Sequence, residues 1–69
     1  MDVESQIRYL VRCCYWYYVR AQPLISDREY DRLFHELKEA EGAFPQSYSP
    51  TQMIYGDREE QYPEWAKTR

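Results

Sequence analysis

The sequence lacks long hydrophobic runs and any excess of positive charge, and each absence excludes a class of protein. No apolar stretch reaches the roughly 18 residues that a membrane-spanning helix needs. The N-terminus also lacks the basic-then-apolar order of a signal peptide, so we expect a soluble cytoplasmic protein. The formal net charge is −3, which argues against a domain that grips a polyanionic backbone, and we expect no direct nucleic-acid binding.

Cysteine and histidine are also scarce. Cys13 and Cys14 are the only cysteines and are adjacent within a predicted helix, where neighbouring side chains point about 100° apart, so no disulfide is expected between them. We expect Cys14 to be a small core side chain and Cys13 a partly exposed thiol. His35 has no second ligand at metal-binding spacing, so the sequence predicts no metal site.

Aromatic side chains are abundant. Twelve of the 69 residues are aromatic and eight of these are tyrosine. A chain of this length forms only one domain with a small core, and large rings bury much area per residue. The number of tyrosines exceeds what a minimal core uses, so some of them are predicted to form a surface.

Residues 2 to 21 carry apolar side chains at three- and four-residue steps, which predicts an amphipathic helix. Asp2 is the expected N-cap. Because a residue before proline disfavours helical geometry, the Gln22-Pro23 step should end the helix near Arg20 or Ala21. The predicted apolar stripe consists of Val3, Ile7, Leu10, Val11, Cys14, Tyr17 or Tyr18, and Ala21.

A second helix is predicted to begin after Ser26, which with Glu29 matches a capping box. Ile25 and Tyr30 have the spacing of a hydrophobic staple across that cap. Gly42 is the expected C-cap. The predicted apolar face consists of Tyr30, Leu33, Phe34, Leu37, and Ala40 or Glu41.

Helical periodicity disappears after Pro45, and residues 46–51 have the composition of a loop. Apolar residues among the charges of the tail predict that residues 53–69 fold back across the two helices, with residues 63–67 forming one helical turn. We therefore expect an all-α fold: a small antiparallel helical hairpin with an irregular C-terminal segment packed on it. The single domain comprises residues 1–69, with a core region at 2–45 and a loop and tail at 46–69.

Five residues flank the predicted link between the helices. In an antiparallel hairpin the last turn of one helix lies beside the first turn of the next, so these side chains should cluster. Tyrosine faces beside carboxylates suit a planar cation such as a pyridinium, and tyrosine hydroxyls, Arg20 or backbone NH groups offer contacts to ribose or phosphate. A role in stability alone would also account for each of these residues, because Tyr30 lies on the apolar face and carboxylates are favoured in the first turn of a helix. The five residues are Tyr17, Tyr18, Asp27, Tyr30 and Asp31.

Several strings of the sequence together resemble domain Ia of bacterial NAD-dependent DNA ligases. The resemblance covers roughly residues 5 to 52, and a composite of this length is far more specific than a short motif. The strings similar to the family signature YYV…P-x-I-S-D-x-E-Y-D-x-L are Tyr17-Tyr18-Val19, Pro23-Leu24-Ile25-Ser26-Asp27 and Glu29-Tyr30-Asp31-Arg32-Leu33. Further similar strings are Glu36-Leu37, Glu41, Phe44-Pro45 and Ser49-Pro50-Thr51-Gln52.

The resemblance implies a helical domain that closes over the nicotinamide mononucleotide (NMN) half of NAD, is needed for self-adenylation and then swings away. It also implies a place in DNA replication and repair. Tyr17 and Tyr30 would flank the nicotinamide ring, and Asp27 and Asp31 match the acidic contacts. Tyr18 stands where some family members have His, so it keeps hydrogen bonding but cannot become a cation.

The sequence departs from the family in two respects. Its only lysines, Lys38 and Lys67, are not followed by x-Asp-Gly, so the K-x-D-G nucleophile motif is absent and the chain cannot form the adenylyl-lysine itself. After Gln52 the family usually shows a basic residue, Val and paired Gly. This chain instead has Met53-Ile54-Tyr55-Gly56-Asp57 and then an acidic, aromatic tail.

The leading hypothesis is therefore an NMN- or NAD-binding module that is not an enzyme by itself and acts with an adenylation domain on another chain. The chain could be a subunit of such a ligase or a domain excised from one, but the divergent tail favours a free-standing small gene product, such as one from a phage or mobile element. The alternative is a protein-interaction module that keeps the fold without the ligand, for example a regulator of a host ligase, which docks through exposed tyrosines, Trp16 and Trp65. A self-sufficient enzyme ranks last, because no nucleophile and base pair is visible.

Overall fold

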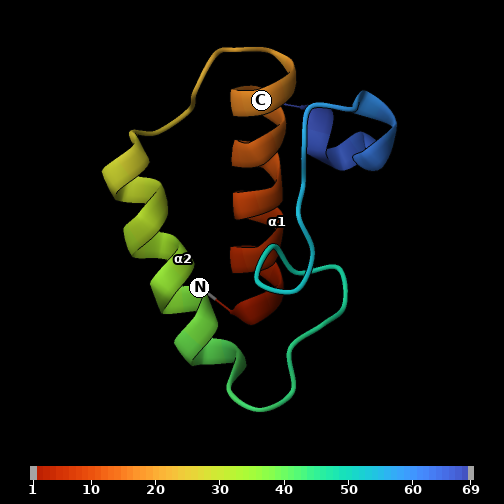
Figure 1. Ribbon diagram of the computed structural model, residues 1–69. Helices are drawn as coiled ribbons and strands as arrows, with labels where there is room; N and C mark the ends of the chain where they lie inside the picture. The colour runs from red at the N-terminus through yellow and green to blue at the C-terminus, as the bar shows by residue number, and fades with distance from the viewer. Residues whose placement is uncertain (1, 69) are drawn as a thin grey trace.

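The computed structural model describes residues 2–68 as helices joined by irregular segments. Figure 1 shows the two long helices side by side and antiparallel, and the described part of the chain contains no strand, so the predicted all-α hairpin is confirmed. None of the helices in that part is long and apolar enough to span a bilayer. The elements in chain order are helix α1 (Val3–Cys14), the π-helical turn η1 (Tyr15–Val19), helix α2 (Asp27–Glu41), and the 3-10 turns η2 (Glu59–Gln61) and η3 (Glu64–Lys67).

Helix α1 and the η1 turn that continues it together begin and end close to where the sequence predicts. Asp2 is the N-cap, and its Oδ1 accepts a hydrogen bond from the backbone N of Ser5 at 2.7 Å. This bond also lowers the pKa of the Asp2 carboxyl, because it stabilises the ionised form. Helical geometry continues without a break through η1 to a C-cap at Arg20, within the predicted range.

The last turn of this helix is wound differently from what the apolar pattern predicts. The backbone N of Arg20 donates to the carbonyl of Tyr15 at 3.3 Å, a bond between residues five apart that defines a π turn. Burial at this end of the helix also differs from the predicted stripe. Tyr15 and Trp16 are buried, whereas the stripe predicted Tyr17 or Tyr18 at this end, and both of those are exposed. Ala21, also placed on the stripe, is exposed and outside the helix.

Helix α2 is capped at both ends as predicted. The Ser26 Oγ accepts a hydrogen bond from the backbone N of Glu29 at 3.1 Å, and Gly42 forms the C-cap with φ +61°. In a complete capping box the Glu29 side chain would also accept a hydrogen bond from the backbone N of Ser26. Here both carboxylate oxygens of Glu29 instead accept hydrogen bonds from the Arg32 guanidinium. Leu37 is fully buried at the centre of the inward face.

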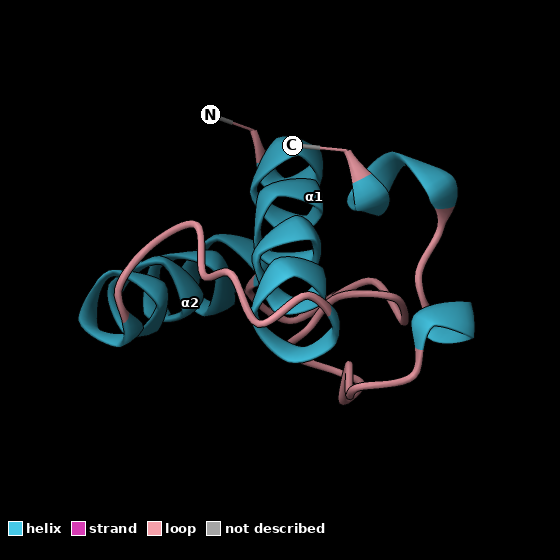
Figure 2. Ribbon diagram, turned by 90° about the horizontal axis from the view of Figure 1, so that it is seen from above, coloured by secondary structure: helices cyan, strands magenta, loops and turns pink. Residues whose placement is uncertain are grey.

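The C-terminal segment packs on α1 opposite α2, so that α1 lies between them in both views (Figures 1 and 2). The guanidinium of Arg12 donates to the Trp65 carbonyl at 3.4 Å, and the indole N of Trp16 donates to the Thr68 carbonyl at 3.3 Å. The predicted turn at residues 63–67 is confirmed as η3 with Pro63 as its N-cap, whereas η2 was not predicted. The prediction that the tail folds back over the hairpin is confirmed.

Aromatic rings join the tail to α1. The ring of Tyr15 packs edge to face against Tyr62, with centroids 5.3 Å apart, and against Trp16 at 5.6 Å. The polar tip of the buried Tyr62 is satisfied, because its hydroxyl donates to the Gly56 carbonyl at 2.7 Å. The buried apolar cluster consists of Ile7, Leu10, Val11, Cys14, Tyr15, Trp16, Leu37, Tyr55, Tyr62 and Ala66. The aromatic content of the sequence therefore supplies the core that so short a chain needs.

We predict that Gly42→Ala destabilises the fold by about 1 to 2 kcal/mol, because an L residue is strained at positive φ. A Cβ at this position meets no atom within 4 Å, so the effect is conformational and not steric. Urea unfolding followed by circular dichroism measures it. Gly56→Ala is the control, because its Cβ meets only the flexible end of Gln61 at 3.3 Å. Equal losses in the two variants would contradict the conformational explanation.

Candidate functional site

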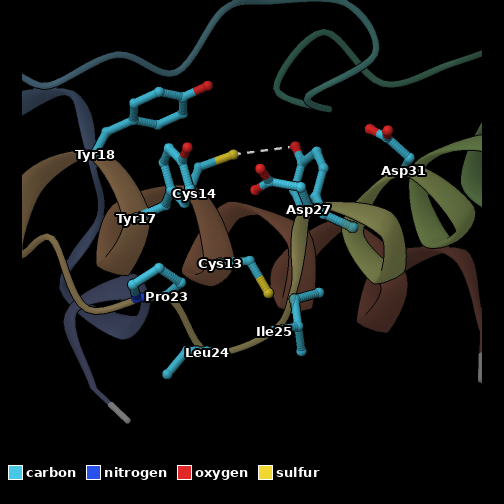
Figure 3. A pocket seen from close by; sticks show the side chains of 10 residues that line it. Cys13, Cys14, Tyr17, Tyr18, Pro23, Leu24, Ile25, Asp27 and Asp31 are labelled. Atoms are coloured by element: carbon cyan, nitrogen blue, oxygen red, sulfur yellow. Dashed lines mark hydrogen bonds between the residues drawn. The ribbon is translucent and has the colours of Figure 1, made fainter.

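A cavity of about 350 Å³ lies where η1 meets the start of α2. All five residues that the sequence predicts as a cluster line it (Figure 3), so the helix ends converge as an antiparallel hairpin requires. The volume is at the lower end of the roughly 300 to 1,000 Å³ of small-molecule sites. The lining residues are Cys13, Cys14, Tyr17, Tyr18, Pro23, Leu24, Ile25, Asp27, Tyr30 and Asp31.

A sharp reversal of the backbone precedes the segment that forms one wall of the cavity. Ala21 has φ +54°, a left-handed conformation that costs an L residue about 1 to 2 kcal/mol. The backbone N of Gln22 donates to the Trp16 carbonyl at 2.8 Å and holds the reversal in place. The link at Pro23 to Ile25 then lines the cavity, although sequence reasoning did not name it as part of the site. The sequence signal that could have identified this link is its position between two converging helix ends.

Tyr17 and Tyr18 are neighbours in sequence, yet both line the cavity. Their rings pack edge to face with centroids 4.9 Å apart and planes at 73°. The rings are 44% and 52% exposed, and within residues 2–68 neither hydroxyl forms a hydrogen bond. Each ring therefore keeps a free surface and a free polar tip for a ligand.

Tyr30 is half-buried and held at two points. Its hydroxyl and the Cys14 thiol share a hydrogen bond of 3.1 Å, drawn as the dashed line in Figure 3. Its ring stacks on Phe34 with centroids 6.2 Å apart. Burial raises the pKa of the Tyr30 phenol, and burial likewise raises the pKa of the Cys14 thiol. Both groups are therefore uncharged at neutral pH.

Cys13 is more buried than the sequence predicts. The sequence predicts a partly exposed thiol here, but Cys13 is only 4% exposed. The face of α1 that carries it is covered, because the link from Pro23 to Ile25 closes over it and lines the same cavity. Burial raises the pKa of this thiol from the ordinary 9.0 to about 11. The interior side of the cavity is therefore apolar and neutral.

Asp27 and Asp31 supply the charge of the cavity. Both side chains are exposed, and within residues 2–68 neither forms an ion pair or a hydrogen bond. Arg20, which the sequence suggested as a phosphate contact, lies instead over the Trp16 ring at 5.4 Å and does not line the cavity. The charged part of the cavity is thus purely acidic.

The described residues contain no group of three or more His, Cys, Asp or Glu side chains that could hold a metal ion. The chemistry available at the cavity is therefore that of exposed tyrosine faces, tyrosine hydroxyls and two unpaired carboxylates. Such a set binds a flat cation and donors such as sugar hydroxyls. It holds no activated nucleophile, because the thiols are protonated and buried.

A comparison with protein families decides the classification. Residues 2–55 match the family model of the DNA ligase-like, N-terminal NAD+-binding domain. The chain belongs to this family. The match includes every residue that lines the cavity and ends before η2 and η3.

Three curated relatives are each named DNA ligase. The chain is 44% identical over 66 residues to the DNA ligase of Persephonella marina, and the match covers 90% of this chain and 9% of that relative. It is also 44% identical over 66 residues to the DNA ligase of Rubrobacter xylanophilus, with 91% of this chain and 9% of that relative covered. It is 56% identical over 45 residues to the DNA ligase of Petrotoga mobilis, covering 61% of this chain and 7% of the relative. The chain thus spans less than a tenth of these relatives. No solved structure matches it.

We predict that the fold loses stability as the pH rises from about 9 to about 11, the ordinary and folded-state pKa values of Cys13. The folded state binds this proton more tightly than the unfolded state, so the contribution is complete below pH 9 and disappears through that window. Urea unfolding at several pH values under reducing conditions measures it. Cys13→Ala should flatten the dependence, and an unchanged slope in that variant would contradict the assignment.

Proposed function

We propose that the cavity binds the NMN half of NAD, and that this domain serves self-adenylation together with an adenylation domain. The observation that carries the proposal is the lining of one cavity by two exposed tyrosines, the anchored Tyr30 and two unpaired carboxylates. Family membership supports the ligand, because the family model describes an NAD+-binding domain. In this proposal the residues that contact the nucleotide are Tyr17, Tyr18, Asp27, Tyr30 and Asp31.

The aromatic residues would hold the nicotinamide ring. A pyridinium is flat and positively charged, and it is attracted to the negative face of a phenol ring. Tyr17 is supported on one side by Tyr18, and Tyr30 is supported by Phe34, so both rings are braced before a ligand arrives. Braced rings lose less conformational entropy on binding, which favours affinity.

The two carboxylates would add charge complementarity. Asp27 and Asp31 have no cation to neutralise them within residues 2–68, so a positive ring or donating ribose hydroxyls would be their first partners. The Asp27 side chain lines the same cavity as Tyr17 and Cys14 (Figure 3). The acidic lining also disfavours close approach of the NMN phosphate, which would therefore point away from Asp27 and Asp31.

The remaining chemistry requires a second domain. Self-adenylation places the adenylyl group of NAD on a lysine of a K-x-D-G motif, and these 69 residues contain no such motif. An adenylation domain, which we propose lies on another chain as in a split ligase, would supply the lysine and the second half of the nucleotide site. The cavity alone contacts only half of NAD, so we expect weak binding in isolation.

The rival role as a ligand-free docking module has less support. That hypothesis relied on exposed Trp16 and Trp65, but Trp16 is 8% exposed and Trp65 is half-buried beneath the Arg8 guanidinium. Tyr17 and Tyr18, which stay exposed where η1 meets the start of α2, belong to the cavity, whereas the exposed Phe44 and Tyr48 lie outside it. We therefore favour a small-molecule ligand over a protein surface.

NMN added to the folded chain should shift the NMR resonances of Tyr17, Asp27 and Tyr30. Asp27→Asn should raise the Kd about threefold to tenfold, because it removes one attractive charge at a largely solvated site. Asp57→Asn is the matched control, since it removes the same charge from an exposed residue that does not line the cavity. Absence of shifts at the cavity, or equal losses in both variants, would contradict NMN binding there.

The proposed adenylation-domain partner is tested by adenylation in trans. An adenylation domain from a related NAD-dependent ligase, expressed without its own N-terminal domain, should gain an adenylated lysine from NAD when this chain is added. The modification is measured by intact mass. The Asp27→Asn variant should slow the reaction, whereas Asp57→Asn should not. If the adenylation domain reacts equally well without this chain, the proposed role in self-adenylation is wrong.

A further inference from the structure

The helical hairpin contains one directional contact between its long helices. Within residues 2–68, the hydrogen bond between the Cys14 thiol and the Tyr30 hydroxyl is the only hydrogen bond that joins α1 to α2. The other side chains that α2 packs toward α1, Leu33, Phe34 and Leu37, are apolar. Apolar packing is non-directional, so it fixes the distance between the helices better than the orientation of one ring.

That contact lies in the wall of the cavity. Cys14 and Tyr30 both line it, and Cys14 is 5% exposed, so water competes little for the bond. The Tyr30 ring is otherwise restrained by its stack on Phe34, whose planes differ by 28°. A stack restrains the plane of a ring, whereas the hydrogen bond restrains its tip. The thiol therefore sets how far the phenol reaches into the cavity.

We propose that Cys14 is a positioning residue that holds Tyr30 in the orientation required for nicotinamide nucleotide binding. The inference rests on the proposed function, because Cys14 acts through Tyr30 on the same site. Cys14 offers only a weak donor and acceptor, so its contribution is to orientation and not to the affinity of a direct ligand contact. Neighbouring Cys13 lines the same cavity but forms no hydrogen bond to Tyr30.

The positioning role is tested first without ligand. In protein labelled with ¹³C at the tyrosine ζ carbon, Cys14→Ala should move the Tyr30 resonance toward those of the exposed Tyr17 and Tyr18, because the hydroxyl loses its partner. Cys14→Ser should restore much of the shift, because a hydroxyl keeps the hydrogen bond. Cys13→Ala is the matched control and should leave the Tyr30 resonance unchanged. Thermal unfolding by circular dichroism checks that each variant is folded.

The consequence for binding is tested by titration with NMN. Cys14→Ala should raise the Kd about threefold to tenfold, the equivalent of one lost hydrogen bond, and Cys14→Ser should recover most of it. An unmoved Tyr30 resonance in Cys14→Ala, or an equal change in Cys13→Ala, overturns the positioning role. If the Tyr30 resonance moves in Cys14→Ala but the Kd for NMN does not change, Cys14 positions Tyr30 without affecting binding, and that part of the proposal is wrong. If the unsubstituted protein does not bind NMN, the proposed function fails, while the ligand-free measurement still decides whether Cys14 orients Tyr30.

Discussion

The structure depends on the burial of α1 from two sides. Helix α2 covers one face and the C-terminal segment covers the other, so a 12-residue helix with its π turn supplies most of the core. Neither covering element is stable by itself, since short helices are marginal in water without tertiary packing. The large rings of Tyr15, Trp16 and Tyr62 bury enough area to offset part of the ordering entropy of so short a chain.

Burial of α1 also determines where the cavity forms. Once Tyr15 and Trp16 point into the core, the next two tyrosines emerge at the end of the helix beside the first turn of α2. The π winding at this point gives up regular α-helical hydrogen bonds, and Ala21 adds a left-handed residue. Both irregularities lie next to the cavity, which agrees with the tendency of backbone strain to gather at functional sites.

The cavity combines a neutral interior with an acidic opening. On the inner side, burial keeps the Cys13 and Cys14 thiols and the Tyr30 phenol protonated. On the outer side, Asp27 and Asp31 remain exposed and unpaired within the described residues. This separation suits a flat cationic ring that lies on aromatic surface with charge at its edge.

Local structure could be predicted from the amino-acid sequence. Apolar spacing, the caps at Asp2, Ser26 and Gly42, and the step before Pro23 predicted both helices, because these signals act between residues close in the chain. The clustering of the five residues at the helix ends was also predictable, since an antiparallel connection brings the two helix ends together.

The division of side chains between core and cavity depends instead on tertiary packing. The tail covers Trp16, the link closes over Cys13, and Cys14 pairs with Tyr30, while Tyr17 and Tyr18 stay exposed. None of these follows from helical periodicity, because each depends on contacts between segments far apart in sequence. Helical spacing shows which side chains share a face, but the packing of α2 and the tail decides which faces are covered.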